Sequence, residues 1–215
     1  MTDLPQREQD RRALVAGVEA WVRRKLEAGD AKAHGWLHTD RVRRTILVLA
    51  RTEAVDPTLA ELAALFHDVG RTVPGPENEH GASSAAMARP LLGNSLLEAS
   101  EADGVLFAIR RHNSGRTDTQ LLCILRDADM LDGLGALGIA RAFMRKSHLP
   151  PYDARVPFEC GTERWPAMYC SDQLMGQMDW YDRLNTATPR AMAHRRLAFM
   201  KQFVAQTRQE IGVTD

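Results

Sequence analysis

Apolar residues recur along the chain at the spacing of amphipathic helices, and no stretch alternates as a strand would. The clearest helix opens at Asp56-Pro57, an N-cap carboxylate followed by proline at the first helical position. Its apolar positions are Leu59, Leu62, Leu65, Phe66 and Val69. Gly70 follows where a C-cap glycine belongs. We therefore expect His67 and Asp68 in the last turn of a mostly buried helix.

The same period predicts further helices over residues 13–28, 80–88, 101–111, 119–144, 173–184 and 188–209. Another begins near His38, which heads an apolar stripe. The region 119–144 is expected to be the longest, and its glycines either break it or allow close backbone approach. The predicted fold class is all-α, a single helical bundle.

Two segments differ from this pattern. Residues 1–12 form a polar N-terminal tail, which leaves residues 13–212 for the domain. Residues 147–166 are rich in proline and predict an irregular, lid-like segment, an active-site rim or a subunit contact.

Composition narrows the class of protein. Lysine and arginine total 28, as do aspartate and glutamate, so the formal net charge is zero. This balance argues against a partner that is a nucleic acid polymer or an anionic membrane, but not against a local basic pocket. Cys123, Cys160 and Cys170 are odd in number and not in CxxC spacing, which suits a reducing cytoplasm. No apolar run approaches the length of a membrane span.

The candidate chemistry begins at the His67-Asp68 pair. A buried carboxylate is costly unless it is paired with a charge or bound to a metal, and imidazole plus carboxylate is a normal ligand set. The alternative is an ordinary helix end with a solvated pair. His38 and an acid within residues 126–132 are further candidate ligands, although a lone histidine on an apolar face is more often a core residue.

The order His38, His67-Asp68 and then a later aspartate resembles the HD-domain superfamily of metal-dependent phosphohydrolases. One branch of it, small bacterial single-domain proteins related to YedJ and YpgQ, is similar from about Trp21 to Glu210. The stretches that carry this resemblance are residues 34–42, 127–141 and 185–196, with His80 followed by Ser83. The resemblance implies an HD domain over residues 13–212.

The resemblance also implies a divalent metal ion on His38, His67, Asp68 and one of two acids. Helical phase leaves Asp127 and Asp129 open. The family's last ligand usually follows an alanine, and Ala128-Asp129-Met130-Leu131 fits that pattern, so Asp129 is the predicted ligand. Manganese, iron, nickel, cobalt, zinc or magnesium would suit the set.

The expected activity is hydrolysis of a small phosphorylated substrate, a nucleotide in the YpgQ-like relatives, by metal-activated water. These relatives imply conversion of a nucleoside triphosphate to the monophosphate and pyrophosphate. Asp68 would bind the metal and orient the water, and Arg41 and Arg71 would stabilise phosphoryl charge. His80 and His112 are candidates for phosphate binding, proton transfer or a second metal. A homodimer is compatible with this scheme.

Two other functions stay open. Some HD-fold proteins are di-iron oxygenases with the order H…HD…H…H…D, which His80 and His112 complete here. A non-catalytic metal-binding module is the other alternative. We favour a single ion and hydrolysis.

Overall fold

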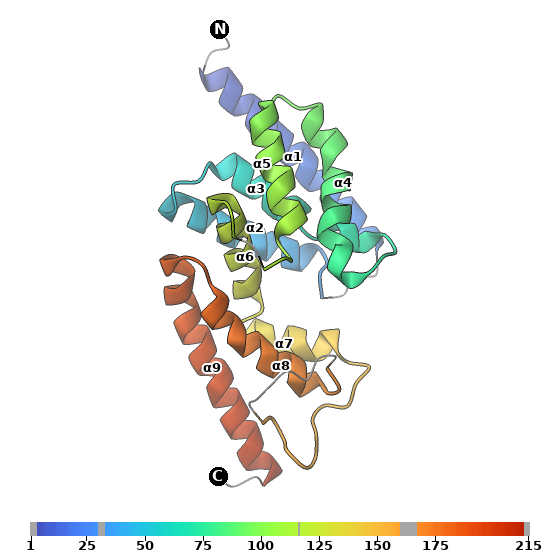
Figure 1. Cartoon of the computed structure of the whole chain (residues 1–215), viewed down its shortest axis with the longest axis vertical. Coiled ribbons are helices and arrows are strands. Elements are labelled where there is room, and N and C mark those ends of the chain that lie inside the picture. Colours follow the sequence, from blue (N-terminus) through green and yellow to red (C-terminus); the bar gives the residue numbers. More distant parts are fainter. Residues whose placement is uncertain (1–3, 30–32, 116, 160–166, 213–215) are drawn as a thin grey trace. The chain divides into compact units, whose positions relative to one another are not determined.

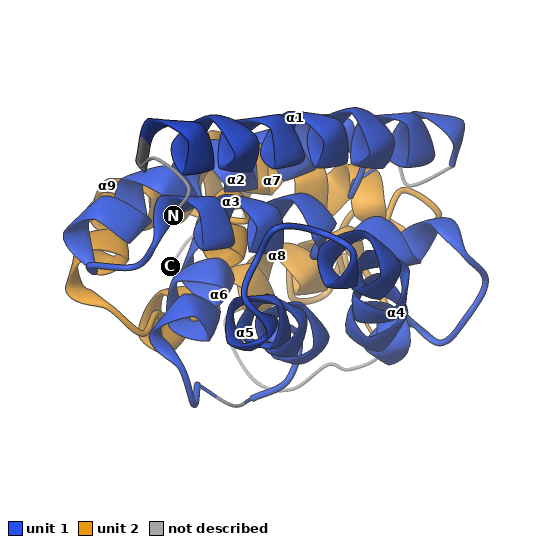
Figure 2. Cartoon of the chain, turned by 90° about the horizontal axis from the view of Figure 1, so that it is seen from above, with its two compact units in different colours: residues 1–128 blue, residues 129–215 orange. Residues whose placement is uncertain are grey.

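The computed structural model describes residues 4–29, 33–115, 117–159 and 167–212 (Figure 1). Every regular element within these ranges is a helix, which confirms the all-α prediction. The chain divides into two compact units, Met1–Ala128 and Asp129–Asp215 (Figure 2). The boundary falls inside helix α6 (Gln120–Asp132). One domain over residues 13–212 stays a prediction.

The first unit is built around α3 (Pro57–Phe66), which contacts α1 (Leu4–Ala28), α2 (Trp36–Thr52) and α5 (Ala99–Arg111). The predicted N-cap is confirmed, because Asp56 accepts hydrogen bonds from the backbone N–H groups of the second and third helical residues. The buried residues of this helix are Ala60, Leu62, Ala63, Ala64, Leu65 and Phe66. This apolar helix carries the His67-Asp68 pair at its end.

Helix α1 begins at Leu4, earlier than the helix start predicted at residue 13, so residues 4–12 of the expected polar tail are helical. The reason lies in contacts that sequence periodicity does not show. Arg11 pairs with Asp56 at 2.7 Å and also with Glu101, which joins the start of α1 to the start of α3 and to α5. These ion pairs hold α1 against α3 and α5.

The end of α3 also differs from expectation. The helix ends at Phe66, and a 3-10 helix, η1 (Val69–Thr72), begins directly after Asp68. Gly70 lies inside η1 and is not a C-cap. A Cβ atom there would lie 2.3 Å from the carbonyl oxygen of His80, so glycine is needed for close approach to the next helix.

That next helix is α4 (His80–Gly93), which follows a short 3-10 helix, η2 (Glu77–Glu79), and packs on η1 and α5. Ser84 fixes the contact, because its Oγ accepts from Gly70 N–H and donates to the carbonyl of His67, each at 2.8 Å. The helix predicted over residues 80–88 has small side chains, and these allow the close packing.

The second unit contains the end of α6, then α7 (Gly135–Arg145), α8 (Cys170–Met178), the 3-10 helix η3 (Asp179–Arg183) and α9 (Ala187–Ile211). The expected helical region 119–144 is therefore broken after Asp132, where Gly135 has a φ of +83°. It is not the longest helix, since α1 and α9 have 25 residues each.

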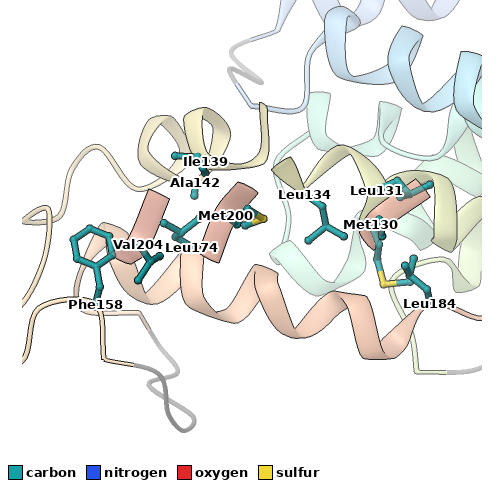
Figure 3. Packing of buried hydrophobic residues seen from close by; sticks show 11 residues of the cluster. Met130, Leu131, Leu134, Ile139, Ala142, Phe158, Leu174, Leu184, Met200 and Val204 are labelled. Carbon is teal, nitrogen blue, oxygen red and sulfur yellow. The ribbon is translucent and has the colours of Figure 1, made fainter. Parts of the chain in front are cut away.

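The core of the second unit gathers apolar side chains from these helices and from the segments between them (Figure 3). It comprises Met130, Leu131, Leu134, Ile139, Ala142, Phe158, Leu174, Leu184, Ala193, Met200 and Val204. Residues 147–159 have no helix, as predicted, and residues 160–166, with Cys160, lie outside the described ranges. No described helix has the length and apolar content that crossing a bilayer requires.

Candidate metal centre

Six nitrogen-bearing side chains of the first unit converge on the carboxylate of Asp68, whose side chain is 3% exposed. They come from the turn before α2, from α2 itself, from both sides of the α3–η1 junction, from the start of α4 and from the end of α5. They are His34, His38, His67, Arg71, His80 and His112.

One oxygen of this carboxylate faces two imidazoles. Asp68 Oδ2 lies 3.5 Å from His38 Nε2 and 3.6 Å from His67 Nε2, and these two nitrogens are 3.2 Å apart. Ligand atoms about 2.1 Å from one ion lie roughly 3.0–3.4 Å from each other in octahedral or tetrahedral geometry. One of the three distances falls inside this range and the other two exceed it by 0.1 and 0.2 Å, so the three atoms lie close to the spacing of ligands of a single divalent ion.

Three histidines are oriented by the helix ends at which they lie. The last carbonyls of a helix lack intrahelical partners, and each of these residues follows a helix and donates its Nδ1–H to the carbonyl three residues earlier. The bonds are His67 to Ala64 at 2.7 Å, His80 to Glu77 at 2.5 Å and His112 to Ile109 at 2.7 Å. With the proton on Nδ1, the Nε2 atom of each ring carries the lone pair, as in ligating histidines.

The other carboxylate oxygen faces a second pair of imidazoles and a guanidinium. Asp68 Oδ1 lies 3.2 Å from His80 Nε2 and 3.8 Å from His112 Nε2, and these nitrogens are 3.0 Å apart. Arg71 donates its Nε–H to the same oxygen at 2.8 Å and an Nη2–H to His80 Nε2 at 3.2 Å. This side of Asp68 thus already holds a positive charge.

The surroundings keep the site in the protonation state that metal binding needs. Burial would raise the pKa of Asp68, but the neighbouring histidines, with His67 and His34 foremost, outweigh it and hold that pKa well below its usual value. Burial lowers the pKa of His34 to about 4 and also lowers the pKa of His80, with Asp68 opposing both shifts. Near neutral pH the carboxylate is ionised and these two imidazoles are neutral.

The structure brings together most of the predicted site residues. His38, His67, Asp68, Arg71, His80 and His112 lie in this cluster. Arg41 is half-buried and follows His38 by about one turn of α2, while half-buried Asp129 is the first residue of the second unit. The roles of all of these residues stay proposals.

His34 is a member of the cluster to which the sequence analysis gave no role. Its Nδ1 lies 2.6 Å from Asp68 Oδ2, and its ring meets that of His38 edge to face. Because His34 lies in the turn before α2 and outside the helix, helical periodicity gave no signal for its place beside His38.

Comparison with known proteins agrees with this fold. The HD domain family matches residues 35–134 of the chain. The chain is 30% identical over 222 residues to the uncharacterized protein YpgQ of Bacillus subtilis. The match covers 100% of this chain and 98% of that protein. The chain therefore belongs to the HD-domain family, a family of the metal-dependent phosphohydrolase kind, and the predicted resemblance is confirmed.

Solved structures give the same relationship. The crystal structure of Bacillus subtilis YpgQ in complex with ADP matches with a TM-score of 0.70 and 25% identity, over 94% of this chain and 96% of that one. An HD-superfamily hydrolase from Bacillus thuringiensis matches with a TM-score of 0.70 and 26% identity, over 95% of this chain and 100% of that one. Both relationships extend over nearly the whole length of each chain.

Proposed function

We propose that this protein hydrolyses a phosphate ester or anhydride of a nucleotide, with one divalent metal ion bound by His38, His67, Asp68 and Asp129. The observation that carries the proposal is the set of distances of 3.2, 3.5 and 3.6 Å among His38 Nε2, His67 Nε2 and Asp68 Oδ2. Asp129 is the fourth ligand in this proposal because of the alanine before it and the leucine two positions after it.

A divalent ion bound there would lower the pKa of a coordinated water and polarise a phosphoryl oxygen. The chain's own groups would supply the rest. Arg71, at 2.8 Å from Asp68 Oδ1, offers N–H donors and positive charge beside the phosphoryl group, and Arg41 would add to that charge. His80 and His112, with Nε2 atoms 3.0 Å apart, would bind phosphoryl oxygens or pass a proton to the leaving group.

A nucleotide substrate is supported by the structure of YpgQ with ADP, since that protein matches nearly the whole of this chain. Hydrolysis of a nucleoside triphosphate to the monophosphate and pyrophosphate is the reaction to examine first. A cytoplasmic location and a homodimer belong to the same proposal, and both await measurement.

The test is a product analysis with purified protein freed of metal by a chelator. Nucleoside triphosphates, nucleoside monophosphates and simple phosphate esters are offered with Mn²⁺, Fe²⁺, Ni²⁺, Co²⁺, Zn²⁺ or Mg²⁺ in turn. Phosphorus NMR distinguishes pyrophosphate from phosphate, and Asp68→Asn is the control for contaminating hydrolases. Absence of metal-dependent hydrolysis for all substrates, or equal rates in the control, would overturn the proposal.

A di-iron oxygenase is the second candidate, and one observation favours it. Asp68 Oδ1, His80 Nε2 and His112 Nε2 lie 3.0–3.8 Å from each other, as ligands of a second ion would. Against it, Arg71 donates to His80 Nε2 at 3.2 Å and occupies the lone pair that a second ion would need. Iron content and oxygen consumption with candidate substrates distinguish the two functions.

A further inference from the structure

We propose that His34 is a positioning residue, which holds Asp68 Oδ2 in the orientation needed to bind the metal by donating a hydrogen bond from Nδ1. This inference rests on the proposed metal site and goes beyond its set of ligands. The contact is the shortest of those from the histidines to Asp68, at 2.6 Å, and both side chains are largely buried, with exposures of 16% and 3%.

The distance identifies His34 as a donor to Asp68, although His34, His38 and Asp68 are close enough to form a ligand group. Two ligands of one ion would lie about 3.0 Å apart or more, whereas 2.6 Å is a charge-assisted hydrogen bond. An ionised carboxylate can only accept, so the proton of the contact is on Nδ1 of His34.

The carboxylate is held from both sides. Arg71 donates to Oδ1 at 2.8 Å and His34 donates to Oδ2 at 2.6 Å, so the two bonds together fix the carboxylate plane. Each carboxylate oxygen has about two lone-pair directions. Oδ2 can therefore accept from His34 and still present a lone pair toward the Nε2 atoms of His38 and His67, which lie 3.5 and 3.6 Å away.

The other ring nitrogen of His34 makes no hydrogen bond to the described residues that would give the imidazole a separate structural role. Its Nε2 is buried and has no hydrogen-bond partner in the described part of the chain. Burial of a polar atom without a partner costs stability, so a purely structural position would favour an apolar side chain or a fully bonded one. A donor to a metal-binding carboxylate gives the imidazole a function that offsets this cost.

The experiment compares Mn²⁺ binding by wild type, His34→Ala and His34→Asn, with free Mn²⁺ measured by electron paramagnetic resonance. Asparagine carries an amide N–H close to the position of imidazole Nδ1 and can restore the bond, whereas alanine cannot. Loss of such a supporting bond typically weakens metal binding about 10–100-fold. We expect that weakening in His34→Ala and recovery of most of it in His34→Asn.

Two controls separate positioning from folding. His194→Ala removes an exposed histidine on α9 and should bind Mn²⁺ as wild type does. Thermal unfolding of the metal-free variants shows whether His34→Ala has lost its fold. Equal affinity in His34→Ala and wild type would overturn the inference. So would equal weakening in the alanine and asparagine variants with an equal fall in unfolding temperature, because that result indicates a structural role.

The wild-type titration distinguishes failure of the proposed function from failure of this inference. If wild type binds none of Mn²⁺, Fe²⁺, Co²⁺, Ni²⁺ or Zn²⁺, the metal site is wrong and the role of His34 is overturned with it. If wild type binds Mn²⁺ and the variants do not follow the expected order, only the role of His34 is wrong.

Discussion

At the scale of single residues, the site depends on one carboxylate with different neighbours at its two oxygens. Asp68 Oδ2 faces His34, His38 and His67, while Oδ1 faces Arg71, His80 and His112. An unpaired buried carboxylate would be unstable, and here positive charge and N–H groups surround it. Single substitutions should therefore separate metal binding from the other steps of the reaction.

Loss of either residue of the His67-Asp68 pair should remove the metal and abolish phosphohydrolase activity. His67→Ala removes a neutral Nε2 ligand and Asp68→Ala removes the charged one, so little affinity remains. Elemental analysis gives metal content, and circular dichroism should still report an α-helical protein. His148→Ala, at an exposed position, is the control. Full metal occupancy in both variants would be incompatible with the proposed site.

The two acids of α6 can be distinguished in the same way. Asp129→Asn should lower metal content as strongly as Asp68→Ala, because an amide lacks the charge that neutralises a divalent ion. Asp127→Asn should have the milder effect on metal content and on turnover. Asp127 is fully buried, so its variant is checked for a lower unfolding temperature. The opposite order would identify Asp127 as the ligand.

His80 and His112 should affect turnover more than metal content. With one ion bound through Oδ2 of Asp68, His80→Ala and His112→Ala are expected to lower the rate and keep one metal per chain. Activity alone cannot decide this, because a second metal site would also lose activity. Metal stoichiometry can: two ions in wild type and one in either variant would favour the di-iron alternative.

At the scale of elements, the site depends on how closely η1 approaches α4. Gly70 makes this approach, because a Cβ atom would lie 2.3 Å from the backbone oxygen of His80 and 2.5 Å from the backbone nitrogen of Ser84. The clash involves backbone atoms, which cannot rotate away as a flexible side chain could. The positions of Asp68, Arg71 and His80 are therefore coupled through one glycine.

Gly70→Ala should lower the free energy of unfolding by about 1–3 kcal/mol, the usual cost of overpacking, and should weaken metal binding as η1 shifts. Gly104→Ala is the matched control, since Gly104 is exposed on α5 and a Cβ there meets nothing within 4 Å. Its alanine should add about 0.5–1 kcal/mol through helix propensity. Urea unfolding measures both values. A neutral Gly70→Ala would show that the two elements can separate without cost.

At the scale of the whole molecule, metal binding should appear as thermal stability. A ligand at 100 times its dissociation constant adds about 2.7 kcal/mol to the folded state. For a chain of this size each kcal/mol corresponds to about 2–4 °C, so the unfolding temperature should rise by about 5–10 °C. Scanning calorimetry with Mn²⁺ and then a chelator measures the shift, with Asp68→Ala as the variant that should not respond.

The two compact units make this measurement more informative. His38, His67 and Asp68 all belong to the first unit, and Asp129 belongs to the second. If the units unfold in separate transitions, metal held by the first unit alone shifts one transition, whereas a ligand from Asp129 shifts both. The same unfolding temperature with and without metal in wild type would contradict the proposed site.

The sequence by itself determined the helical class and the order of the candidate ligands. Helical periods are local, so the stripe on α3 and the cap at Asp56 could be predicted without tertiary information. The spacing of His38, His67-Asp68 and the later acids indicated the family that the comparisons then confirmed. For the region 119–144 the sequence left open whether its glycines break the helix or allow close backbone approach. A glycine permits a positive φ but does not require it.

Only the tertiary structure decided which side chains meet. Arg11 of α1 pairs with Asp56 and Glu101, and Gly70 of η1 makes close contact with α4. The contacts of Asp68 with His34 and His80 likewise join segments distant in sequence. Periodicity reports which face of a helix is apolar, but the partner of a polar group is set by the packing of several helices, and that packing has no local signal.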